Sequence, residues 1–141
     1  MIDITSANAT VALSVESLFT VELQQFGADS SFASEAQQMA ETRMGVDGHL
    51  VAGYTPAVKT VTITLEPSSP SLTFLQLLKQ AQETNMKPYE CQMVISVPSI
   101  GKRFSYSKGV LQQCKDLPDG NTVLAPTTWT FHFEGLSVEG L

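Results

Sequence analysis

One stretch, Val58–Glu83, changes from a strand pattern to a helix pattern and so limits the folds open to the chain. In Val58–Leu65, aliphatic side chains alternate with threonines, which is typical of a strand with one buried face. The strand pattern stops before Pro67, and the residues that follow have helical spacing. Strand and loop patterns dominate the rest of the chain. We therefore expect a mainly β fold with one helix.

The predicted helix begins in a segment of serines and proline. Ser69 or Ser71 can cap its first turn, and Pro70 is well placed there because it is compatible with a helix start. Asn85 and the Lys-Pro pair soon after it are expected to end the helix. A stripe of leucines should pack the helix against the sheet, and its main members are Leu72, Leu75 and Leu78.

Alternation of apolar and polar residues predicts the other strands. They are Thr10–Val15, Leu18–Phe26, Tyr89–Val97, Lys102–Leu111 and Thr128–Glu134, with Val110–Lys115 either continuing its strand or bulging at Gly109. About seven short strands without repeats or βα alternation favour an antiparallel β-sandwich or barrel with one flanking α-helix. At 141 residues the chain fits a single domain, 1–141.

Three segments lack a clear strand pattern. Met1–Ala9 has few apolar residues and is predicted to be an N-terminal arm that orders only against something else. Gly27–Ser34 has the small, polar composition of a loop, with Phe32 as its one apolar anchor. Gly135–Leu141 is predicted to be a short, weakly apolar tail.

Glu35–Tyr54 is predicted to form a long protruding β-hairpin, within a hairpin and loop region that spans 35–57. Its first half contains helix formers, but Asp47-Gly48 is a strong signal for a two-residue type I′ turn, which needs positive φ at both positions. Apolar and polar residues are mixed irregularly on both sides of this turn, so the hairpin cannot bury a face within its own domain. We therefore expect the hairpin either to lie over the core of the domain as a lid or to protrude and be covered by another subunit.

The composition argues against several classes of protein. A net charge of −6 with only eight dispersed basic residues is unsuited to a protein that neutralises phosphates of nucleic acid. Charged residues are only 16% of the chain, so much of the surface should be neutral, as in a protein largely covered by partners. Neither a membrane-spanning run nor an export signal is visible, so we expect no membrane partner and no secretion.

Residues that could carry chemistry are few and scattered. His49 and His132 have no further metal ligands at suitable spacing, and no nucleophile elbow or phosphate-binding loop is present. Cys91 and Cys114 lie in predicted strands and are expected to be core residues or free thiols. We therefore expect no catalytic residues, no metal site and no cofactor.

The order of signals resembles the tail tube proteins of long-tailed bacteriophages. Those signals are G-V-D-G-H at Gly45–His49, V-T-I-T-L at Val61–Leu65, the serines of Ser68–Ser71 and the helix pattern of Leu72–Ala81. The resemblance is close over Met44–Ala81 and otherwise rests on length and strand order. Hcp-like tube proteins of type VI secretion share the same plan.

This resemblance implies a homo-hexameric ring, closed by joining sheets edge to edge, and rings stacked into a hollow tube. DNA would pass through an acidic lumen without specific binding. The implied location is the tail of the virion, after assembly in the host cytoplasm. Sheath, baseplate and tail terminator proteins are further partners consistent with it.

The resemblance also implies that the hairpin contacts the neighbouring ring. The residues expected to make this contact are Met44, Val46, Asp47, Gly48, His49, Leu50 and Val51. Other readings stay open at this point. The chain fits a tube initiator or baseplate subunit, a type VI secretion tube-like protein, or, in another class, a small ligand-binding β-barrel with the hairpin as a lid.

Overall fold

The structure, a computed structural model, describes residues 9–23 and 32–141, so the predicted N-terminal arm lies almost wholly outside the described residues. The chain is mainly β, with one α-helix in the described part, as predicted. In chain order the elements are β1 (Thr10–Val15), β2 (Phe19–Glu22), β3 (Phe32–Ser34), β4 (Ala40–Met44), β5 (Leu50–Tyr54), β6 (Lys59–Leu65), α1 (Leu72–Asn85), β7 (Cys91–Val97), the 3-10 helix η1 (Pro98–Ile100), β8 (Lys102–Cys114) and β9 (Thr127–Gly140).

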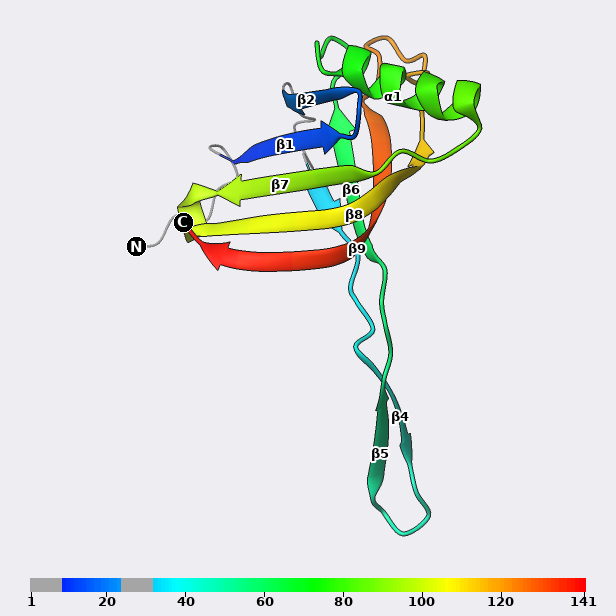
Figure 1. Cartoon of the computed structure of the whole chain (residues 1–141), viewed down its shortest axis with the longest axis vertical. Helices are drawn as coiled ribbons and strands as arrows, with labels where there is room; N and C mark the ends of the chain where they lie inside the picture. Colours follow the sequence, from blue (N-terminus) through cyan, green and yellow to red (C-terminus); the bar gives the residue numbers. More distant parts are fainter. Residues whose placement is uncertain (1–8, 24–31) are drawn as a thin grey trace.

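Seven antiparallel strands form one hydrogen-bonded sheet in the order β2-β1-β7-β8-β9-β6-β3. This sheet curls over on itself, because β9 curves from the layer of β1, β7 and β8 to the layer of β6 and β3 behind it (Figure 1). Among the strands that the structure describes, β4 and β5 pair only with each other, and they form the predicted long hairpin, which projects away from the curled sheet. The predicted sandwich with one flanking helix and a protruding hairpin is therefore confirmed. We call everything except residues 35–57 the body.

The core of the body lies inside the curled sheet. The predicted alternation in β6 and β7 is confirmed, since their aliphatic side chains face this core. In the same core, the ring of Phe133 packs with its centre 5.2 Å from the centre of the Tyr106 ring. Leu75 and Leu78 of α1 are fully buried in the same core, and Leu72 packs against it. The largest fully buried side chains come from β9 and are Trp129, Phe131 and Phe133.

The boundaries of α1 follow the sequence signals. Ser71 occupies the N-cap position, and its backbone N–H donates to the Ser69 hydroxyl oxygen at 3.3 Å. The helix ends at Asn85, and Met86 follows in the left-handed conformation with φ 52°. The Asn85 side-chain amide donates to the Tyr89 hydroxyl, which joins the end of the helix to the entry of β7.

The prediction of a C-terminal tail is wrong, because residues 135–140 continue β9 as a strand. They pair with the first half of β8, which places Leu136 opposite Tyr106 and Val138 opposite Phe104. This half of β8 would otherwise have an open edge, and its partner lies about thirty residues further along the chain. Weak alternation alone did not reveal that distant pairing.

The prediction of a loop over Gly27–Ser34 is wrong at its end, and its first part, 27–31, lies outside the described residues. Residues 32–34 form β3, in which Phe32 pairs with Ile63 and Ser34 with Val61 of β6. Three residues with one apolar anchor are too short for an alternation pattern. The predicted strand Leu18–Phe26 is described only as far as Leu23, and its β2 part is confirmed.

The predicted bulge at Gly109 is present, and β8 also continues past it. The register between β7 and β8 shifts here, and Lys108 adopts a positive φ of 54°. A second shift between β8 and β9 lies between Leu111 and Gln113. Bulges increase local twist and bend a strand, so these two irregularities help β8 to follow the curl of the sheet.

Candidate functional site

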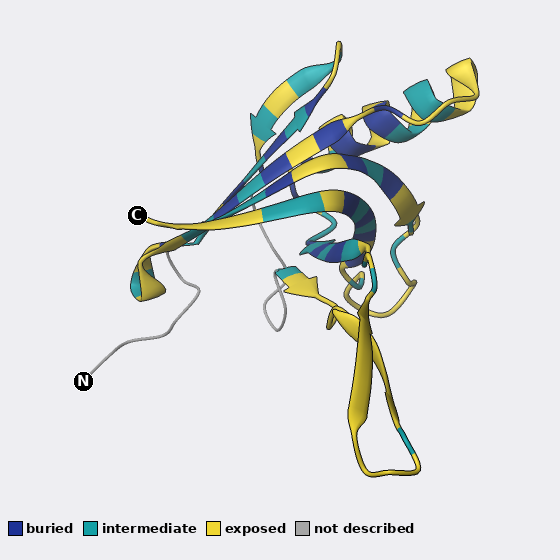
Figure 2. Ribbon diagram, turned by 60° about the horizontal axis from the view of Figure 1, so that its bottom comes forward, coloured by how far each residue is buried: buried dark blue, intermediate teal, exposed yellow. Residues whose placement is uncertain are grey.

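The hairpin β4–β5 is the part of the described chain that is most separated from the core. It continues outward from β3 and β6, and every residue of both its strands is exposed (Figure 2). It leaves the body at the end opposite α1, along the longest axis of the molecule. It therefore does not cover the body as a lid, which was one of the two arrangements expected.

The turn of the hairpin is not the predicted two-residue type I′ turn. The Gly45 N–H donates to the His49 carbonyl oxygen at 2.8 Å, and the Gly48 N–H donates to the Gly45 carbonyl oxygen at 3.0 Å. Gly48 has φ 85°, whereas Asp47 is not among the described residues with positive φ. This is a three-residue loop, Val46–Gly48, in which a type I turn is followed by a left-handed glycine.

The longer loop shifts the register by one residue and so changes which side chains share a face. Met44 pairs with Leu50, Thr42 with Ala52 and Ala40 with Tyr54, so these residues lie on one side of the ribbon. The opposite side has the pairs Arg43–Val51 and Glu41–Gly53. The apolar and polar residues that are mixed irregularly along the sequence are thus distributed over two distinct faces of the hairpin. The apolar hairpin face consists of Ala40, Met44, Leu50, Ala52 and Tyr54.

The predicted contact residues are divided by this arrangement. Met44 and Leu50 lie on the apolar hairpin face, and Val51 lies on the opposite face. The tip contains Val46, Asp47 and Gly48, with the Asp47 carboxylate accepting from the His49 N–H at 3.2 Å. Ala52 and Tyr54, which the sequence analysis did not name as contact residues, also lie on the apolar hairpin face. A two-residue turn would pair Val46 with His49. If Gly45 is paired with His49 instead, Ala52 and Tyr54 fall on the same face as Met44.

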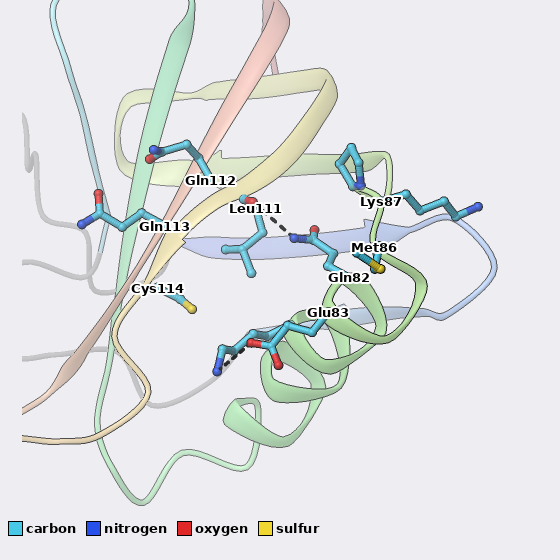
Figure 3. A pocket seen from close by; sticks show the side chains of 10 residues that line it. Gln82, Glu83, Met86, Lys87, Leu111, Gln112, Gln113 and Cys114 are labelled. Atoms are coloured by element: carbon cyan, nitrogen blue, oxygen red, sulfur yellow. Dashed lines mark hydrogen bonds and ion pairs between the residues drawn. The ribbon is translucent and has the colours of Figure 1, made fainter.

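A groove of about 470 Å³ lies at the other end of the molecule, between the C-terminal half of α1 and the end of β8 (Figure 3). The Gln82 side-chain amide points from α1 to β8 and donates to the Leu111 carbonyl oxygen at 3.5 Å. The Gln82 Oε1 atom is buried and has no hydrogen-bond partner in the described part of the chain. The groove is lined by Lys79, Gln82, Glu83, Met86, Lys87, Pro88, Leu111, Gln112, Gln113 and Cys114.

The charges around this groove are unevenly paired. Lys79 forms ion pairs with Asp116 and, at 3.2 Å, with Glu83, and these carboxylates raise its pKa. Lys87 forms no ion pair among the described residues, and its ammonium group lies 5.3 Å from the centre of the Tyr89 ring. Lys87 is therefore a cation available to a partner at the rim of the groove.

The two cysteines are free thiols, which is one of the states expected from the sequence. Burial raises the pKa of Cys91 to about 12. Burial and the neighbouring Asp116 raise the pKa of Cys114 to about 11. Within residues 9–23 and 32–141, no three His, Cys, Asp or Glu side chains are grouped so that they could hold a metal ion. A helix long and apolar enough to cross a membrane is likewise not found in this part.

Comparison with solved structures shows a fold shared with parts of contractile injection systems. A chain of the anti-feeding prophage (AFP) baseplate has a TM-score of 0.66 at 12% identity, over 99% of this chain and 97% of that chain. A chain of the PVC sheath-tube complex in the extended state has a TM-score of 0.64 at 11% identity, over 93% and 88%. A chain of the PVC sheath/tube terminator has a TM-score of 0.65 at 9% identity, over 99% of each chain.

Comparison with curated proteins gives no significant match. The family model described as "Tail fiber protein gp32" matches residues 2–137, which is nearly the whole chain. The resemblance to phage tail proteins is thereby confirmed at the level of the phage tail, although the family's description does not name a tube. The chain belongs to the tail fiber protein gp32 family, a family of phage tail proteins.

Proposed function

We propose that this protein is a non-enzymatic structural subunit of a phage tail tube, in which copies form rings that stack around a lumen. The exposed apolar hairpin face carries this proposal. Its larger side chains are Met44, Leu50 and Tyr54, each more than half exposed, and an apolar patch of this kind at the end of a projecting ribbon marks an interaction site. A head-to-tail partner would cover it.

Ring closure would use the open edges of the sheet. β2 pairs only with β1, and β9 beyond Phe133 pairs only with β8, in the part of the chain that the structure describes. These are opposite edges of the layer β2-β1-β7-β8-β9. Adding the β9 edge of one copy to the β2 edge of the next would continue the sheet from subunit to subunit, and six copies would complete the ring.

The proposed lumen would conduct DNA without binding it. The net charge of −6 supports this role, because an acidic wall repels phosphates. Sheath, baseplate and terminator proteins would then be neighbours of the tube. The virion tail would be its location, after assembly in the host cytoplasm.

A tube initiator or baseplate subunit is the second candidate. The fold matches chains from an AFP baseplate and an AFP tube-terminating cap as well as from a sheath-tube complex, so the shared fold is compatible with several positions along a tail. The two candidates differ in whether the pure protein polymerises by itself. An initiator would stop at a single ring.

Sedimentation velocity of the purified wild-type protein over a range of concentrations tests the proposal. We expect ring-sized species at low concentration and larger species as the concentration rises, because each added ring covers another set of hairpins. Rings that never grow would favour the initiator. A monomer at every concentration would contradict both candidates.

Replacing Gly48 with Val is expected to weaken stacking of rings more than folding of the body. Gly48 has φ 85°, which a β-branched residue adopts only with strain, on the order of 1–3 kcal/mol. The strained turn would displace the tip, whereas the body lies far from it. Gly53→Val is the matched control, because Gly53 lies in β5 without a positive φ or close neighbours. Equal losses of stacking and thermal stability would show that the hairpin is part of the folding core.

A further inference from the structure

The two ends of the molecule differ in a way that suits a head-to-tail contact between identical copies. The hairpin tip lies at one end of the longest axis, and α1 with its groove lies at the other (Figure 1). In stacked rings, each copy presents the α1 end to a neighbour's hairpin end. A contact of this type joins two different surfaces of the same chain, so it needs a receiving site distinct from the hairpin.

The groove has the chemical features that such a site requires. Met86, which is 91% exposed, contributes apolar lining to the groove together with Pro88 and Leu111. Lys87 adds a cation at the rim that has no ion-pair partner among the described residues. The groove thus suits a short segment with an apolar side chain and a negative charge.

The hairpin tip has this combination. The Val46 side chain is fully exposed at its end, and the neighbouring Asp47 carboxylate is also exposed. The turn is narrow because it contains only three residues between Gly45 and His49. We propose that the tip Val46–Gly48 of one copy docks in the groove between α1 and β8 of a copy in the adjacent ring. Val46 contacts the apolar lining of the groove, and Asp47 pairs with Lys87.

This inference rests on the proposed stacking of rings, and a cross-linking experiment separates the two. Cys114 lines the groove, so Val46→Cys places a second thiol at the opposite end of the chain. Oxidation of assembled protein should then join tip to groove. Because each chain has two reactive ends, the products should form a ladder of covalent multimers. The raised pKa of Cys114 leaves little thiolate at neutral pH, so the reaction is run at pH about 9.

The control is Val46→Cys combined with Cys114→Ser, which should give no ladder when the assembled fraction, measured by pelleting before oxidation, is matched to that of Val46→Cys. A contact between two tips would give only covalent dimers, and these dimers would also form in the control. If the Val46→Cys protein assembles into rings and tubes but forms no ladder, the docking site is wrong and the tube proposal stands. If neither wild type nor variant assembles, the tube proposal fails, and this inference fails with it.

A charge exchange gives a second, independent readout. Asp47→Lys and Lys87→Asp should each raise the concentration needed for tube growth by roughly 3- to 10-fold, because each places like charges together at the contact. The double variant should recover most of this loss. Single variants that assemble like wild type, or a double variant no better than the singles, would overturn the Asp47–Lys87 pairing.

Discussion

Replacing Leu50 with Glu is expected to weaken tube growth strongly while leaving the body as stable as in wild type. Leu50 lies on the apolar hairpin face beside Met44 and is 65% exposed in the isolated chain, so the folded monomer loses almost nothing. In a stack, the change removes roughly 1.5–3 kcal/mol of apolar burial per subunit and adds the cost of desolvating a carboxylate. The concentration required for polymerisation should rise at least tenfold, measured by pelleting and thermal melting in parallel.

Val51→Glu is the matched control for this prediction. Val51 is the next residue along β5 and is 51% exposed, but it lies on the opposite face, paired with Arg43. Its carboxylate would remain in solvent next to a cation, so assembly should change little. If both variants polymerise equally well, the apolar hairpin face is not a subunit interface. A large drop in melting temperature for Leu50→Glu would instead place Leu50 in the folding core.

Gly109→Ala is expected to have the opposite effect, because it should lower the stability of the body. A Cβ atom at this position would lie 2.1 Å from Phe133 Cδ1 and 2.7 Å from the His132 carbonyl oxygen. Phe133 is buried in the core and the second neighbour is backbone, so neither can move without disturbing the β8–β9 ladder. We expect a loss of about 3 kcal/mol in the free energy of unfolding. This corresponds to a fall of roughly 10 °C in Tm for a chain of this size.

Gly120→Ala is the control for that substitution. A Cβ atom at Gly120 would have no neighbour within 4 Å in the part of the chain that the structure describes, and Gly120 does not have a positive φ. Its stability should stay within about 0.5 kcal/mol of wild type. Chemical denaturation of the two variants measures the difference. Equal stability of Gly109→Ala and wild type would mean that β8 can move away from Phe133 at this bulge, contrary to the packing described above.

Local patterns predicted much of this fold because several strands and the helix are encoded by neighbouring residues. The alternation in Val58–Leu65 and the leucine stripe after Ser71 are complete within one element each, so β6 and α1 were found close to their true bounds. Residues 135–140 and β3 were missed because they are strands only through distant partners, β8 and β6. Their own sequences contain too little apolar alternation to indicate this.

The hairpin that carries the candidate site was predicted from the sequence, but the arrangement of its two faces was not. Asp-Gly is compatible with a two-residue turn and with a three-residue loop that ends in a left-handed glycine. The choice depends on the bond between Gly45 and His49, which a propensity rule does not describe. A difference of one residue reverses the faces of β5 relative to β4. The sequence alone therefore did not reveal that Leu50 and Tyr54 share a side with Met44.

Negative-stain electron microscopy of the purified wild-type protein tests the central claim most directly. We expect rings with a central hole that stack into tubes as the concentration rises, with no other tail protein added. The hairpins should then be buried between successive rings. Particles that remain single, compact and without a hole at every concentration would contradict the account, because the apolar hairpin face would then be exposed without a partner copy.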